Sequence, residues 1–171
     1  ANYISSAATT LDTSVLLLNN GTEILDATAN PATLGDNLDL HALRVSRDIN
    51  VSADGQFNQI IIRSGGLMQA ANTPTINADL YFGALGDGTG QALVWANNNT
   101  LQINGRIFAS EVVKSGTAFL NVRSDQAQFT GNWNINGGGI QFLTPNSAST
   151  GQVILNGSHM ADNDNTTNLT E

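Results

Sequence analysis

Pairs of apolar residues, with one position between the two members, recur along this chain at a nearly constant interval. The first members of successive pairs are Leu16, Leu38, Ile60, Leu80, Leu101, Leu120 and Ile140. A second series at a similar interval consists of Val94, Val113, Trp133 and Val153. An interval of about 20 residues suits a coil of short strands and turns that stacks on the previous coil at about 4.8 Å. The interval therefore predicts an all-β chain folded as a parallel β-solenoid, with about seven coils of 19–22 residues.

Within each interval, apolar and polar residues alternate in short bursts. Examples are LNVR at 120–123, WNIN at 133–136 and GIQF at 139–142. Successive side chains of a strand point to opposite faces, so the apolar members are expected to point into the core. The stretch LDLHALRVS at 38–46 comes nearest to a helical pattern, and we interpret it as a strand as well. Gly, Asn and Ser separate the bursts, as in KSGT and NGGG, and these residue types suit tight corners with positive φ.

Asparagine is abundant at the expected corners. Its side chain tolerates the left-handed conformation, and in stacked coils it can pass amide hydrogen bonds from one coil to the next as a ladder. The alternative is ordinary solvent-exposed turn chemistry. Six asparagines also begin Asn-x-Ser/Thr triplets, namely Asn20, Asn50, Asn98, Asn156, Asn165 and Asn168. In a chain so rich in Asn and Thr, we interpret these triplets as compositional.

The length of 171 residues is sufficient for one domain with a continuous core. We expect a single solenoid domain over residues 1–155, followed by a polar connector or frayed end over 156–171, where apolar periodicity is absent. The sequence GSHM at 157–160 is treated as native because it continues directly from an apolar strand pattern.

Charge and cysteine content exclude several classes of function. The chain has 14 acidic and 6 basic residues, for a net charge of −8, and no basic cluster. This balance argues against nucleic acid and anionic lipid as partners. The absence of Cys excludes thiolate catalysis, cysteine-type zinc sites and disulfide bonds. No apolar run approaches the roughly 18 residues of a membrane span.

The two histidines, His41 and His159, are the first candidates for chemistry. Neither belongs to a spacing that binds metal. Asp39 near His41, with one of the many serines, could form a hydrolase trio, but no Gly-x-Ser-x-Gly motif is present. We therefore interpret both histidines as turn or surface residues.

Other candidates are a glycine-rich segment and pairs of carboxylates. The segment GALGDGTGQAL at 83–93 lacks the spacing of a nucleotide-binding loop or of a tandem calcium repeat, so a protruding loop is expected. Cleavage of polysaccharides needs two carboxylates roughly 5 to 10 Å apart in a groove. Asp36 with Asp39, and Asp162 with Asp164, are possible pairs that surface solvation explains equally well. The sequence predicts no catalytic, cofactor-binding or metal-binding residue.

Four aromatic residues could stack on sugars if they are exposed: Tyr3, Tyr81, Trp95 and Trp133. Trp133 belongs to the second apolar series, and we expect it in the core.

Residues 98–155 resemble the autotransporter-associated β-strand repeat of bacterial autotransporter passenger domains. The stretches that carry the resemblance are LQINGRI at 101–107, VVKSGTAFLNV at 112–122 and FTGNWNINGGGIQF at 129–142. The chain departs from the family pattern at Ala118, where Gly is frequent, and FNQIIIRSGGLMQA at 57–70 looks like a degenerate copy. The resemblance implies a right-handed parallel β-helix that is exported across the outer membrane and displayed or released outside the cell. It transfers no catalytic residue.

These observations predict a noncatalytic, extracellular or cell-surface solenoid with a structural or adhesive role. Its expected partners are neighbouring solenoid segments or copies of itself, a host or matrix glycan, and the outer-membrane translocator during export. Nucleic acid and soluble cofactors are not expected. One alternative is a filament subunit that stacks end to end, because a solenoid without a cap presents unpaired strand edges. Another is a carbohydrate-active β-helix with paired acids in a groove.

Overall fold

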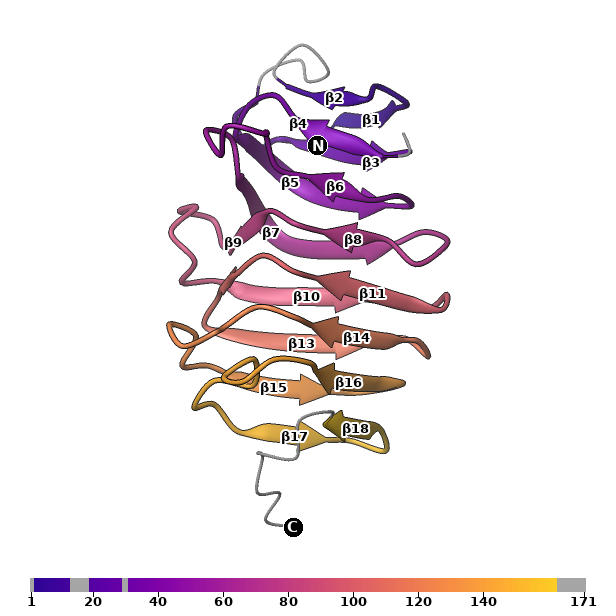
Figure 1. Cartoon of the computed structure of the whole chain (residues 1–171), viewed down its shortest axis with the longest axis vertical. Helices are drawn as coiled ribbons and strands as arrows, with labels where there is room; N and C mark the ends of the chain where they lie inside the picture. The colour runs from indigo at the N-terminus through magenta and orange to yellow at the C-terminus, as the bar shows by residue number, and fades with distance from the viewer. Residues whose placement is uncertain (1, 13–18, 29–30, 163–171) are drawn as a thin grey trace.

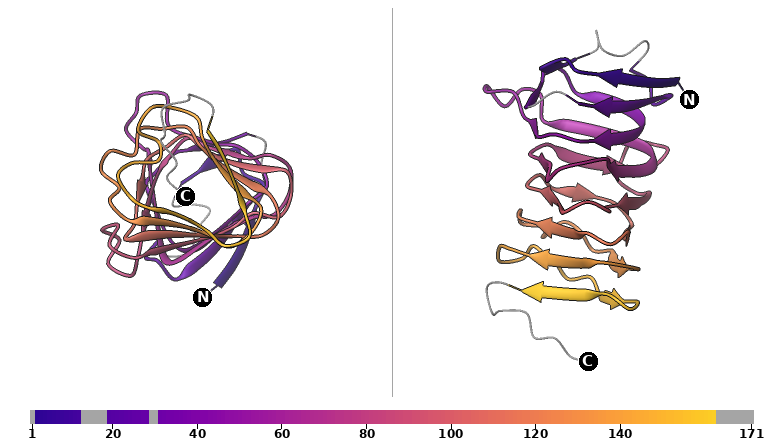
Figure 2. Two further views of the ribbon diagram at one scale, coloured as in Figure 1. Left: turned by 90° about the horizontal axis from the view of Figure 1, so that it is seen from below. Right: turned by 90° about the vertical axis from the view of Figure 1, so that its right-hand side faces the viewer.

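The computed structural model describes residues 2–12, 19–28 and 31–162. Across these residues, short parallel strands stack as a β-solenoid of about eight turns, with no helix among them (Figure 1). The described residues accordingly contain no helix that is long and apolar enough to span a membrane. The view along the axis in Figure 2 shows successive turns superimposed around a common interior. The predicted all-β parallel solenoid is confirmed, with about eight turns in place of the expected seven and with turn lengths that vary more than expected.

Two parallel sheets form the main walls of the solenoid. The strands of the first sheet, in spatial order, are β1 (Asn2–Ser6), β3 (Glu23–Ala27), β5 (Leu38–Val45), β7 (Gln59–Gln69), β10 (Gln91–Trp95), β13 (Glu111–Ser115), β15 (Asn132–Ile135) and β17 (Val153–Leu155). Two further strands, β9 (Asp79–Phe82) and β12 (Ile107–Phe108), pair with each other, and β9 also pairs with β7. The strands of the second sheet are β2 (Thr10–Leu11), β4 (Ala32–Leu34), β6 (Ile49–Asn50), β8 (Thr75–Ile76), β11 (Thr100–Ile103), β14 (Phe119–Val122), β16 (Gly139–Phe142) and β18 (His159–Asp162).

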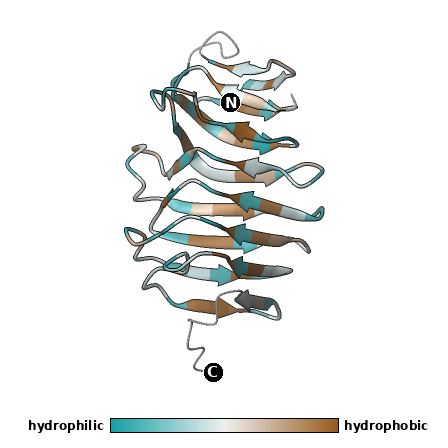
Figure 3. Ribbon diagram, in the orientation of Figure 1, coloured by the Kyte–Doolittle hydropathy of each residue, from teal (hydrophilic) through white to brown (hydrophobic). Residues whose placement is uncertain are grey.

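The second sheet contains the apolar column that the repeat predicts. Leu101 of β11 lies opposite Leu120 of β14, which lies opposite Ile140 of β16. All three side chains are completely buried. The hydropathy colouring in Figure 3 shows the alternation of apolar and polar positions along such strands. The core is therefore a pile of inward side chains in which each turn covers the one before.

The first apolar series nevertheless joins two different columns. Leu38, Ile60 and Leu80 are aligned in β5, β7 and β9, but the column continues to Ile107 of β12 and not to Leu101, which lies in the second sheet. The nearly constant interval persists across this change by coincidence. Loops lengthen some turns of the first sheet. The number of residues between aligned positions in neighbouring turns therefore varies. It is small between Ile24 and Ala42 and clearly larger where Gly66 lies opposite Leu93.

The second series is wrong at two of its four positions. Trp133 does lie opposite Val153, but its neighbour on the other side is Val112, and Val112 lies opposite Ala92. Val113 points outward, and Val94 belongs to the adjacent inward column. Strands β10 and β13 carry apolar residues on both faces, so alternation alone could not show which face is inside.

The stacked turns also continue beyond residue 155. Strand β18 pairs with β16 in register from His159 to Asp162, so GSHM lies in the last described turn and not in a connector. Residues 163–171 lie outside the described residues, and so do Leu16 and Leu18 of the first expected pair.

Asparagines hold the corners as predicted. Asn104 donates its side-chain amide to Asn77 at 2.7 Å, and Asn77 donates to Asn50 at 2.8 Å, which forms a ladder over three turns. Among the described residues, the non-glycine positions with positive φ are Asn19, Asn72, Asn99, Asn146 and Ser149.

Candidate functional site

The outward face of the first sheet carries an apolar column. One residue per turn lies in register along it, and the aligned positions are Tyr3, Ile24, Ala42, Gly66, Leu93 and Val113. A neighbouring outward column contains Asp26, Arg44, Met68 and Trp95. Outward positions of a solenoid normally face water, so a column of this composition distinguishes this face from the polar surroundings.

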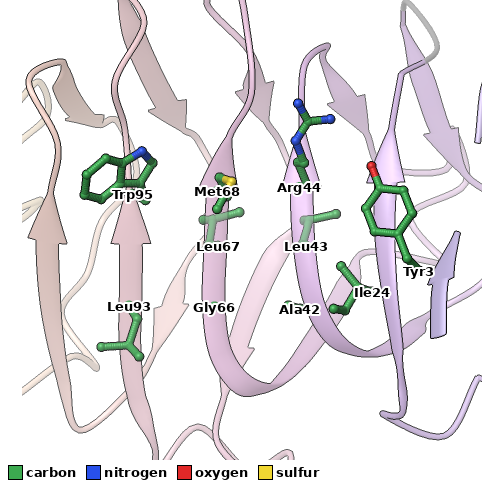
Figure 4. A pocket seen from close by; sticks show the side chains of 10 residues that line it. All are labelled: Tyr3, Ile24, Ala42, Leu43, Arg44, Gly66, Leu67, Met68, Leu93 and Trp95. Carbon is green, nitrogen blue, oxygen red and sulfur yellow. The ribbon is translucent and has the colours of Figure 1, made fainter. Parts of the chain in front are cut away.

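Within this face lies a groove of about 320 Å³ (Figure 4). Ala42 and Gly66, which carry little or no side chain, line it between larger neighbours. Tyr3 stands at one end of the groove and Trp95 at the other, as Figure 4 shows. Four large apolar side chains at the groove are strongly exposed, with exposed fractions of 59% for Tyr3, 46% for Trp95, 45% for Met68 and 43% for Leu93.

A polar cluster holds the Tyr3 end of the groove. The Tyr3 hydroxyl donates to Asp26 Oδ2 at 2.5 Å, and the Arg44 guanidinium donates to the same oxygen. The hydrogen bond to Asp26 raises the pKa of Tyr3, so the phenol remains a neutral donor at physiological pH. Asp26 itself is buried, and its Oδ1 atom has no hydrogen-bond partner among the described residues. This cluster fixes the orientation of the Tyr3 ring and balances the charge of Arg44.

The aromatic candidates divide between the core and the surface. Trp133 is fully buried, as expected, and packs edge-on against Phe129 and Phe142. Tyr81 stacks on Phe108 with ring centroids 4.2 Å apart, so one of its faces is covered. Tyr3 and Trp95 are the exposed pair, and the structure places them at one groove. The sequence had identified both residues but not that they border the same groove, and it had not identified the other side chains that line the groove.

The possible trio around His41 does not assemble. Asp39 accepts two hydrogen bonds from Arg63, at 2.7 and 2.5 Å, and this pairing raises the pKa of the guanidinium further. Ser64 meets His41 through the backbone, because its hydroxyl donates to the carbonyl oxygen of His41 at 2.6 Å. His159 is an exposed residue of β18.

The expected loop and acid pairs have simple structural roles. Residues 83–90 form a protruding loop between β9 and β10, in which Asp87 accepts hydrogen bonds from Thr89 that lower its pKa. Asp36 accepts a hydrogen bond from the backbone of Asn37, whereas Asp164 lies outside the described residues. No group of three His, Asp or Glu side chains in the described part of the chain could hold a metal ion. That the chain is not an enzyme stays a prediction.

Four of the six asparagine triplets can be located. Asn50 belongs to the ladder, Asn156 donates to Asn136 at 2.7 Å, and Asn98 donates to the carbonyl oxygen of Ala70 at 3.1 Å. Asn20 accepts a hydrogen bond from Thr22 within its own turn. Asn165 and Asn168 lie outside the described residues. The located side chains thus serve the corners of the solenoid.

A buried lysine is a feature that the sequence reasoning missed. Lys114 lies in an inward position of β13 between Val94 and Ile135, and its side chain is fully buried. Its ammonium group donates to the carbonyl oxygens of Gly116, Ala118 and Gly137, and the first and last of these bonds measure 2.8 and 2.7 Å. Burial lowers its pKa to about 8. Lys114 begins the KSG stretch, so the motif was visible in the sequence but its inward direction was not.

Comparisons of the chain with models of protein families, with characterised proteins and with solved structures find no match.

Proposed function

We propose that this chain is a noncatalytic solenoid segment of an extracellular, autotransporter-type surface protein, with the apolar face of the first sheet as its adhesive surface. The observation that carries the proposal is the groove between Tyr3 and Trp95, because a contiguous exposed apolar patch on a polar protein marks an interaction site. Stacked turns provide a rigid support for it, since β3, β5, β7 and β10 are each paired on both sides. Rigid elements position a binding surface at little entropic cost.

Adhesion can be tested with beads coated with the purified protein. We expect coated beads to attach to matrix-covered or host-cell surfaces, and beads coated with Trp95→Ala protein to attach much less. Leu85→Ala is the matched control, because Leu85 is also an exposed apolar residue but lies in the loop at 83–90. Equal attachment of all three proteins and of uncoated beads would contradict an adhesive role. Protease added to intact producing cells should digest the protein if it is displayed outside.

The last described turn favours a second candidate, the end-to-end filament subunit. Leu155 occupies the inward position opposite Ile135, yet it is 43% exposed whereas Ile135 is fully buried. Val153 and Met160, which also continue inward columns, are only partly buried. An additional turn placed on β17 and β18, from this chain or from another copy, would cover all three. Sedimentation and electron microscopy over a range of concentrations test this candidate, and a purely monomeric protein would exclude it.

A further inference from the structure

The groove is long and narrow. Tyr3 on β1 and Trp95 on β10 are separated by four strand steps, through β3, β5 and β7, which corresponds to about 19 Å at the usual spacing of paired strands. Between the two aromatic rings, the outward positions are small at Ala42 and Gly66. The groove therefore runs along the solenoid axis, across the strands, with Tyr3 and Trp95 at its two ends (Figure 4).

The exposed apolar area at the groove is modest. The exposed fractions of Tyr3, Met68, Leu93 and Trp95 correspond to about 400 Å², if each side chain contributes on the order of 200 Å² when fully exposed. A standard protein interface buries about 800 Å² on each partner. These four side chains alone would supply about half of the area that a second copy of this chain would bury on this face. A narrow linear ligand fits the area better.

The lining of the groove offers an ionic ligand no unpaired charge. Among the described residues, Arg44 is the one charged side chain that lines it, and its guanidinium is already paired with Asp26. The chain as a whole carries a net charge of −8, which repels anionic polymers and anionic membranes. The groove is thus suited to an uncharged ligand.

The backbone of this face offers nothing to an extended peptide. Peptides that bind to sheets generally add a strand at an exposed edge, where backbone groups are free. Strands β3, β5, β7 and β10 are each paired on both sides, so their backbone groups are occupied. A carbohydrate needs no such edge, because its C–H faces pack on aromatic rings and its hydroxyl groups form hydrogen bonds at the rim.

We propose that this groove binds an uncharged glycan chain laid along the solenoid axis. Its sugar rings stack on Trp95 and Tyr3, and its hydroxyl groups accept hydrogen bonds from N–H groups of Arg44 that Asp26 does not use. Met68 and Leu93 pack against the C–H edges between the two rings. This inference rests on the proposed adhesive function and specifies the chemical class of its ligand.

The test uses calorimetric titration of the whole chain with cello-, chito-, laminari- and malto-oligosaccharides, and with heparin as an anionic comparison. We expect at least one uncharged oligosaccharide to bind with a dissociation constant of about 1 mM or tighter. Binding should also change the fluorescence of Trp95, while Trp133, which is completely buried, should not respond. Tyr3→Ala should weaken binding about three- to tenfold and Trp95→Ala at least as much. Trp95→Phe should restore part of the affinity, and Leu85→Ala should leave it unchanged.

Several results would overturn the inference. These are no binding of any uncharged oligosaccharide at about 10 mM, binding of heparin alone, equal affinity of Trp95→Ala and the unmodified protein, or a Trp95-dependent self-association in place of glycan binding. Trp95→Ala removes an outward side chain, so unchanged circular dichroism will show that loss of binding is not loss of folding. If Trp95→Ala abolishes bead attachment while no glycan binds, the adhesive function stands and the glycan assignment fails.

Discussion

Lys114 offers the sharpest test of how this solenoid is stabilised. Its ammonium group lies in the core at the corner between β13 and β14, where it donates to three backbone carbonyl oxygens and to no carboxylate among the described residues. Two effects oppose each other at this position. Burial disfavours the charged form, whereas the three acceptors favour it. The lowered pKa of about 8 means that burial is the stronger effect.

The consequence for stability follows from proton linkage. In the unfolded chain Lys114 has an ordinary pKa of 10.5, so between pH 8 and 10.5 the unfolded state binds more protons than the folded state. Stability therefore rises with pH through this window. The pKa difference corresponds to a penalty of about 3 kcal/mol near pH 7, which falls below about 1 kcal/mol near pH 10.

The Lys114→Met variant isolates this contribution, because it keeps the length of the side chain and removes the titrating group. Urea unfolding followed by far-ultraviolet circular dichroism should show the unmodified protein gaining about 2 to 3 kcal/mol relative to Lys114→Met between about pH 7 and pH 10. Near pH 10 the variant should be the less stable protein by about 1 to 3 kcal/mol, because it leaves the corner carbonyl groups without their donor. A pH-independent difference between the two proteins would refute the reasoning. Direct titration of the lysine by NMR provides the same test if the variant does not fold.

Three further perturbations test the core, the close backbone contacts and the ladder by the same unfolding assay. Trp133→Ala should lower the free energy of unfolding by about 3 to 5 kcal/mol because it leaves a large cavity, whereas the outward Trp95→Ala should lower it by less than about 1 kcal/mol. Similar losses of stability in the two variants would contradict the assignment of Trp133 to the core and Trp95 to the surface. Gly105→Ala should destabilise by about 1 to 3 kcal/mol, because a Cβ atom there would lie 1.8 Å from the carbonyl oxygen of Ala78, and a neutral effect would show that the turns are less closely stacked. Asn77→Ala removes two hydrogen bonds of the asparagine ladder and should lower the free energy of unfolding by about 1 to 2 kcal/mol. Amide hydrogen exchange should then become faster at the adjoining corners. Unchanged protection from exchange would mean that the ladder does not stabilise the fold.

The repeat interval and the alternation within it were sufficient to determine the architecture. Leu101, Leu120 and Ile140 could be aligned from the sequence because the turns between them have nearly equal lengths and the inward positions of each strand are consistently apolar. Stacking of nearly equal turns buries such a series continuously. The asparagine corners were predictable for the same local reason, since they depend on backbone conformation within a few residues.

Register and facing were decided only in three dimensions. The alternation of a strand shows which residues share a face but not which face points into the core. Val112 and Val113 could therefore be distinguished only by their neighbours in the next turn, Trp133 and Asn134. The groove depends on the same information. Tyr3 and Trp95 are far apart in sequence and lie at the two ends of one groove because the lengths of four intervening turns set which outward positions face it. The local pattern specifies which residues of a strand share a face, whereas the lengths of the turns decide which residues of different turns lie side by side.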